Sequence, residues 1–128
     1  MATQVTQDIR ISVRARFEPE QSDPKQGRYI FSYRIRIENR GSRTVQLLRR
    51  KWSIVDSLAA PREVAGPGVV GETPVLAAGE AFSYNSYCDL RSAFGRMHGQ
   101  YAMQHTDDGS RFDVVIPAFD LICPYAGN

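Results

Sequence analysis

Apolar and polar residues alternate along the first third of the chain. From Ile9 to Phe17 every second residue is apolar, and the same two-residue period returns from Arg28 to Ile37. This period is typical of β-strands with one buried face, because successive side chains of a strand point to opposite sides. No segment keeps apolar residues at helical spacing for three turns, and residues 89–94 allow one short helical turn at most. We therefore predict a protein built almost wholly from strands.

A third alternating run follows at 45–56, after the turn sequence NRGSR. Gly41 in this turn is expected to take the positive φ that other residues avoid. The apolar residues of the run change parity between Leu47 and Trp52. This change predicts a bulge or bend near residues 48–50.

The second half resumes the alternation after a segment rich in glycine and proline. Residues 57–80 hold three prolines and four glycines, and we expect a loop there with short strand pieces such as the two valines at 69–70. A hairpin turn is predicted at HTDDGSR, because Asp-Gly is a preferred pair in tight hairpin turns. Three further strands are expected at 82–86, at 97–103 and at 112–121, the last interrupted at Pro117.

These patterns predict one all-β, antiparallel sandwich of the immunoglobulin or fibronectin type III kind, with about seven strands. A chain of 128 residues fits a single domain, which we place at 1–128 with its core at about 8–124. Cys88 and Cys123 form no CxxC pair, and both are expected to be free thiols. The sequence shows neither a membrane-length apolar run nor the apolar stretch of a signal peptide, so we expect a soluble cytoplasmic protein without a membrane partner.

Basic residues concentrate in the first half of the chain. Residues 1–62 hold 13 basic and 6 acidic residues, whereas residues 63–128 hold 3 basic and 8 acidic ones. Like charges on one sheet face repel, so glutamates such as Glu18 and Glu38, or an acidic partner, should lie among them. The alternative is a solvated face compensated within the domain, and nucleic acid ranks below a protein partner because exposed aromatic residues are not interleaved. The predicted docking face consists of six arginines that share one side if the first two strands pair antiparallel: Arg10, Arg14, Arg16, Arg28, Arg34 and Arg36.

The string GPGVVG at 66–71 matches the G-x-G-x-x-G pattern of dinucleotide-binding folds. That motif requires a following helix, and Pro74 and Gly79 disfavour a helix here. A glycine-rich turn can still direct successive N–H groups at an anion, and the alternative is that these glycines only permit tight turns. The second hypothesis is therefore a phosphate or nucleotide site formed by Arg50, Arg62, Gly66, Gly68, Val69, Val70 and Gly71.

The sequence contains no recognisable catalytic or metal-binding constellation. Cys88 could act as a thiolate with His98 or His105 as base, but no activating feature accompanies it. The two histidines have opposite parity on one predicted strand, so they should point to opposite faces rather than share a metal. The aspartates at 107–108 and at 113 are expected to serve a turn. We predict no catalysis, no metal site and no cofactor.

Four segments resemble, in order, the sequence pattern of the ApaG family: VQLLRRKWSIVD, VAGPGVVGETPVLAAGEAFSYNS, GRMHGQYAM and FDVVIPAFDLICP. The resemblance covers about residues 8–124 and implies a fibronectin type III-like β-sandwich. Family members are small bacterial proteins named in connection with cobalt and magnesium efflux, often encoded beside a diadenosine tetraphosphate hydrolase. Similar domains in eukaryotic F-box proteins and in a DNA polymerase delta interacting protein look like protein-binding modules, and no enzymatic activity is established for the family.

The resemblance therefore implies a non-catalytic protein-binding module. Its expected partner is an unidentified protein of acidic character, and a homodimer stays open. The alternative is an accessory protein that binds pyrophosphate, a nucleotide or a diadenosine polyphosphate at the glycine-rich loop.

Overall fold

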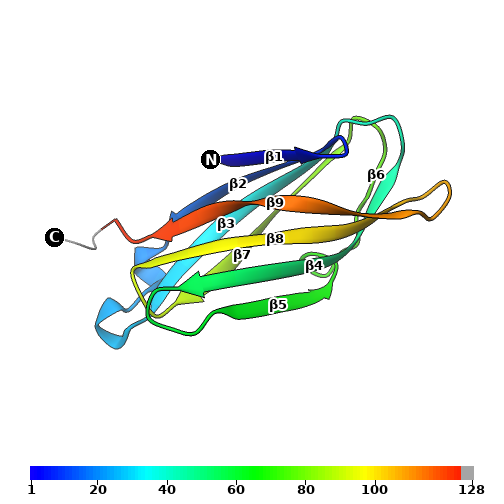
Figure 1. Ribbon diagram of the computed structural model, residues 1–128. Coiled ribbons are helices and arrows are strands. Elements are labelled where there is room, and N and C mark those ends of the chain that lie inside the picture. Colours follow the sequence, from blue (N-terminus) through cyan, green and yellow to red (C-terminus); the bar gives the residue numbers. More distant parts are fainter. Residues whose placement is uncertain (125–128) are drawn as a thin grey trace.

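Two antiparallel β-sheets pack face to face in the computed structural model of the chain, which describes residues 1–124 (Figure 1). Its strands, in chain order, are β1 (Ala2–Thr6), β2 (Ile9–Phe17), β3 (Tyr29–Asn39), β4 (Val45–Asp56), β5 (Arg62–Pro67), β6 (Val75–Leu76), β7 (Ala81–Leu90), β8 (Phe94–His105) and β9 (Arg111–Ile122). One sheet has the order β1-β2-β3-β7 and the other the order β5-β4-β8-β9, with β6 paired to β4.

The prediction of an all-β sandwich of the fibronectin type III-like kind is confirmed. The helical segments of residues 1–124 are two single 3-10 turns between β2 and β3, η1 (Pro19–Gln21) and η2 (Pro24–Gln26). No helix in this part of the chain is long and apolar enough to cross a membrane.

The described chain forms nine strands rather than about seven. The three that the sequence patterns miss are β1, β5 and the two-residue β6. In β5 only Gly66 is buried, so backbone pairing with β4 holds this strand and inward side chains contribute little. A strand without an apolar face leaves no two-residue period to detect.

Two register shifts mark the second sheet. The pairing of β4 with β8 shifts between Leu47 and Arg49, which confirms the predicted bulge. The expected interruption of the alternation at Pro117 is confirmed, although β9 continues through this residue to Ile122. The β8–β9 pairing shifts register here, between the pairs Met97–Phe119 and Gly99–Ile116. A bulge at this point accommodates a proline, which has no N–H to donate to the ladder.

The turn after β3 does not use the positive φ that we expected at Gly41. Gly41 is not among the glycines of residues 1–124 with positive φ, whereas Gln7 and Asp8 have φ of 46° and 66° in the β1–β2 turn. Gly41 gives this turn space, because an added Cβ there would lie 3.2 Å from the Cβ of Asp8. The N–H of Arg40 donates to the carbonyl of Asp8 at 2.9 Å and holds the two turns together.

The core lies between the sheets, and the two sides of the sandwich differ. Its centre includes Tyr33, Trp52 and Phe119, whose ring centroids lie 5.6 to 5.9 Å apart. The predicted core positions of Trp52, Phe119, Tyr84 and Tyr101 are confirmed, since all four are buried. On one side β9 packs against β1 and β2 and closes the sandwich. On the other side the edge strands β5 and β7 leave a cleft between the sheets.

Candidate functional site

The antiparallel pairing of β2 with β3 places a group of arginines on the outer face of the first sheet. Arg14 stands directly opposite Arg34, and Arg10 stands opposite Glu38. The structure brings together five of the six predicted arginines, but Arg28 lies before β3, where its backbone forms an isolated β-bridge with Asp23. We call the group the arginine face; it consists of Arg10, Arg14, Arg16, Arg34 and Arg36.

Glutamates interleave with part of the arginine face, as the repulsion argument predicts. Glu38 lies 3.7 Å from Arg10 and 3.1 Å from Arg36, and Glu18 lies 3.7 Å from Arg16. None of the ion pairs found among residues 1–124 involves the facing pair formed by residues 14 and 34. A groove of about 340 Å³ runs over this pair, and its lining contains four arginines and one glutamate.

The glycine loop, residues 66–72, is a compact turn. Val69 and Glu72 exchange both backbone hydrogen bonds, at 2.8 and 2.9 Å, around two central residues with positive φ. This is the signature of a type I′ turn, with Val70 at φ 44° and Gly71 at φ 80°. The strand piece expected at 69–70 is therefore wrong: Val69 forms an isolated bridge and Val70 belongs to the turn.

The backbone of the glycine loop is largely engaged within the protein. The N–H of Gly68 donates to the carbonyl of Leu48 at 2.8 Å, and Val69 and Glu72 use their N–H groups on each other. Arg50 donates from one guanidinium nitrogen to the carbonyls of Pro67 and Gly68, at 2.8 and 3.0 Å. The loop thus turns carbonyls toward a cation, so an anion here would depend on side chains more than on a row of N–H groups.

Two of the loop glycines make close contacts, and the contact at Gly68 is the more restrictive. An added Cβ at Gly66 would lie 3.2 Å from the Arg50 guanidinium, so this glycine lets the arginine lie flat over the strand. An added Cβ at Gly68, whose φ is 61°, would lie within 2.3 Å of the Glu72 carbonyl oxygen. By contrast, Gly71 has open space around its Cβ position.

The other predicted arginine of this site, Arg62, spans the gap between the two sheets. From β5 it donates to the carbonyl of Asp89 on β7 at 2.6 Å and to its carboxylate at 3.3 Å. Arg50, Arg62 and the valines at 69–70 all line one cleft of about 350 Å³ between β5 and β7, whereas the three glycines shape the loop without lining the cleft. The structure therefore gathers the predicted cationic residues around a cleft and not around the loop backbone.

The interior of the cleft contains residues that sequence reasoning did not assign to a site. They include Tyr33 from β3, Tyr84 and Ser86 from β7 and Trp52 from β4. Burial is the largest influence on both tyrosines and raises the pKa of each, while the positive charge of Arg50 lowers it. These residues come from strands far apart in sequence, so no local motif could identify them.

The cleft also contains Cys88, the candidate nucleophile. Burial raises the pKa of the Cys88 thiol to about 11, and the nearby Arg62, 3.7 Å from the sulfur, lowers it only in part. The proposed bases lie elsewhere: His98 is exposed on β8, and His105 stacks on Phe112 with ring centroids 4.5 Å apart. No group of three or more His, Cys, Asp or Glu side chains that could hold a metal ion occurs among residues 1–124.

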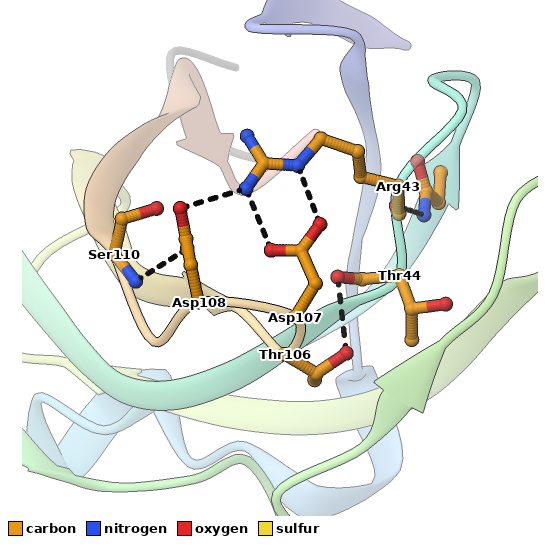
Figure 2. A network of polar contacts seen from close by, with 7 residues as sticks. Arg43, Thr44, Thr106, Asp107, Asp108 and Ser110 are labelled. Atoms are coloured by element: carbon orange, nitrogen blue, oxygen red, sulfur yellow. Dashed lines mark hydrogen bonds and ion pairs between the residues drawn. The ribbon is translucent and has the colours of Figure 1, made fainter.

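The aspartates at the β8–β9 hairpin form a structural network (Figure 2). Arg43 donates two hydrogen bonds to Asp107, at 2.7 and 2.9 Å, and lies 3.2 Å from Asp108. Hydrogen bonds from Ser110 hold the pKa of Asp108 down to about 2. Asp113 lies in β9, beyond the turn. The predicted role of the first two aspartates in the turn is confirmed, and their ion pair with Arg43 also attaches the hairpin to the β3–β4 turn.

Comparison with known proteins identifies the family. The model of the ApaG domain family matches residues 19–105. Proteins named Protein ApaG from Paramagnetospirillum magneticum and Anaeromyxobacter dehalogenans are 48% and 46% identical to this chain over 125 and 128 residues. The alignments cover 98% of this chain and 95% of the first relative, and 100% of both chains for the second. A Bordetella pertussis protein whose crystal structure bears the name ApaA superposes with a TM-score of 0.88 at 44% identity, covering 92% of this chain and 95% of that one. The chain therefore belongs to the ApaG domain family.

Proposed function

We propose that this protein is a non-catalytic binding module of the cytoplasm, which docks an acidic segment of a partner protein on its arginine face. The observation that carries the proposal is the direct opposition of Arg14 and Arg34 across the β2–β3 pair. A role of this protein in cobalt or magnesium efflux would then be exerted through the partner protein that it binds.

The opposition of Arg14 and Arg34 is unfavourable for the isolated domain. Like charges directly opposite on neighbouring strands destabilise a sheet, and Glu38 lies beside Arg10 and Arg36 instead. A carboxylate placed between two guanidinium groups would remove the repulsion and could accept paired hydrogen bonds from either. The groove of about 340 Å³ over this pair offers room for acidic side chains of a partner.

The charge of the face also predicts how a partner arrives. A surface of one sign steers an oppositely charged partner and raises the association rate, and salt weakens this effect. We therefore expect binding to be sensitive to ionic strength.

The alternative, an anion held by the glycine loop, receives less support. The N–H groups of Gly68, Val69 and Glu72 are engaged within the protein, and Arg50 is turned toward loop carbonyls. We keep the arginine face as the first candidate because its cations face solvent and each other.

A single charge reversal, Arg14→Glu, tests the proposal. The substitution creates an opposite-charge pair with Arg34, so we expect the domain to become more stable by about 0.5–1 kcal/mol. The same substitution should release partners captured from an extract of the source cell and flatten the salt dependence of their binding. Urea unfolding measures the first effect, and capture at several salt concentrations measures the second.

A matched control is Arg111→Glu, because Arg111 is exposed on β9 of the opposite sheet and the change in net charge is the same. We expect this control to keep the partners. If both variants capture the same partners with the same salt sensitivity as the wild type, the arginine face is only a solvated surface.

A further inference from the structure

The cleft between β5 and β7 has the size and position of a ligand site. Both strands are sheet edges, and the sandwich is open between them, whereas β9 closes the opposite side. The cleft has a volume of about 350 Å³, which lies in the range of small-molecule pockets. Arg62 and Asp89 join the two edges across it.

The inner walls of the cleft are aromatic with a few hydroxyl groups. Trp52 is 3% exposed and Tyr33 is 5% exposed, so both form a firm apolar floor. The hydroxyl of Tyr84 is hydrogen-bonded to that of Tyr101 on the facing sheet. Ser86 lowers the pKa that burial raises at the hydroxyl of Tyr33. Such a floor suits an apolar body of about the size of one ring.

One cation that lines the cleft, Arg50, takes part in none of the ion pairs found among residues 1–124. Arg62 is paired with the Asp89 carboxylate at 3.3 Å. Arg50 donates to two neutral carbonyls, which orient its guanidinium but leave its charge uncompensated. Arg50 lines the cleft, and its positive charge acts there on the hydroxyls of Tyr33 and Tyr84. Asp56, behind the cleft wall, also acts on Arg62 and Cys88, so Arg62 faces two carboxylates. Arg50 is the cation left over, and its single positive charge matches one negative charge on a ligand.

The rim of the cleft keeps apolar side chains in contact with water. Val64 on β5, Val70 on the glycine loop and Tyr87 on β7 are 40, 54 and 60% exposed. Val70 also occupies the first central position of the type I′ turn with φ 44°, where Asn, Asp or Gly would be less strained. Strained residues of this kind cluster at ligand-binding sites.

We propose that this cleft binds a small organic carboxylate with an apolar body. The carboxylate lies against the Arg50 guanidinium, the apolar body lies against Trp52 and Tyr33, and the apolar rim covers the ligand. A single carboxylate fits the one unpaired cation, whereas phosphate or pyrophosphate would bring two or more negative charges into a partly dehydrated site with too few cations. This site is independent of the arginine face, which lies on the outer side of the first sheet.

Phenylacetate, its neutral analogue benzyl alcohol and inorganic pyrophosphate are the probes. Trp52 is the only tryptophan of the chain and lies in the cleft, so its fluorescence and its indole N–H resonance report occupation directly. For a ligand of this size we expect saturation at millimolar phenylacetate. Benzyl alcohol and pyrophosphate should bind at least fivefold more weakly.

Two substitutions move the affinity in opposite directions. Asp89→Asn removes the carboxylate that neutralises Arg62 while the backbone carbonyl of Asp89 still holds this arginine in place, so phenylacetate should bind at least threefold more tightly. Ser86→Leu fills the cleft and should weaken binding at least tenfold. Asp89 is exposed on an edge strand, so its substitution leaves the fold intact even if Ser86→Leu does not.

Arg14→Glu on the arginine face is the matched control and should leave phenylacetate binding unchanged. The proposal is overturned if no probe perturbs Trp52, if benzyl alcohol equals phenylacetate, or if pyrophosphate binds more tightly. It is also overturned if Asp89→Asn weakens the binding of phenylacetate. A loss of partner capture by Arg14→Glu with intact phenylacetate binding would separate this site from the proposed docking function.

Discussion

Gly68→Ala should destabilise the domain far more than Gly71→Ala, although both glycines have positive φ. The two residues lie in the same glycine loop, with φ of 61° and 80°. At Gly71 an added Cβ meets nothing within 4 Å, whereas at Gly68 it would lie 2.3 Å from the Glu72 carbonyl oxygen and 2.9 Å from its carbon. The pair therefore separates the cost of the backbone conformation from the cost of the close contact.

The magnitude follows from the contacts of the loop. A left-handed conformation costs a non-glycine residue about 1–2 kcal/mol, and alanine recovers about 0.4–1 kcal/mol by restricting the unfolded chain, so Gly71→Ala should cost about 1 kcal/mol. Gly68→Ala adds the displacement of the type I′ turn, which loosens the hydrogen bond to Leu48 and the two bonds from Arg50. At about 0.5–1.5 kcal/mol for each of these three bonds, added to the backbone cost, the total for Gly68→Ala is about 4 kcal/mol.

Urea unfolding followed by the fluorescence of Trp52 measures both variants, because this residue is 3% exposed in the folded state. The midpoint should fall while the slope with urea stays the same. If Gly68→Ala and Gly71→Ala agree within about 0.5 kcal/mol, the close approach of residues 68 and 72 does not limit the loop, and the reasoning fails.

Two further predictions concern ionisable groups. Burial raises the pKa of Asp56, but hydrogen bonds from the 91–92 turn and from Leu58 outweigh it and hold the pKa below its ordinary value. The stability that the ionised Asp56 contributes is therefore complete above about pH 4 and is lost as the pH falls through the folded-state pKa. Asp56→Asn should lower the free energy of unfolding by about 2–4 kcal/mol at pH 7. In urea titrations at acid pH, the difference in this free energy between variant and wild type should become smaller. Burial raises the pKa of the Cys88 thiol to about 11, so at pH 8 this thiol should react with iodoacetamide at least tenfold more slowly in the native protein than in the unfolded chain. Mass spectrometry measures both rates, and equal rates would contradict the burial of this thiol.

Strands with one buried face were predictable from the sequence, because apolar residues recur at every second position and these side chains point inward. The alternation located β2 and β3 in the first half and β7 to β9 in the second, and the change of parity in β4 located its bulge. The two-residue period does not detect β1 and β5, because these strands have no row of apolar side chains that points inward. Hydrogen bonds between backbone groups hold them in their sheets. At Pro117 the change of parity located a second bulge, but only the pairing with β8 decided that the proline sits within a continuous strand.

The two candidate sites also differ in how far the sequence could predict them. Parity alone placed the arginines on the outward face, because the intervening apolar residues must point to the core. Only the register of β2 on β3 decided that Arg14 faces Arg34 and that Arg28 lies apart. The cleft depended wholly on tertiary structure, since Arg50, Arg62 and the aromatic floor come from strands of two sheets. A sequence determines which side of a strand each residue occupies, but contacts between distant strands depend on how the sheets pack, and no local pattern contains that information.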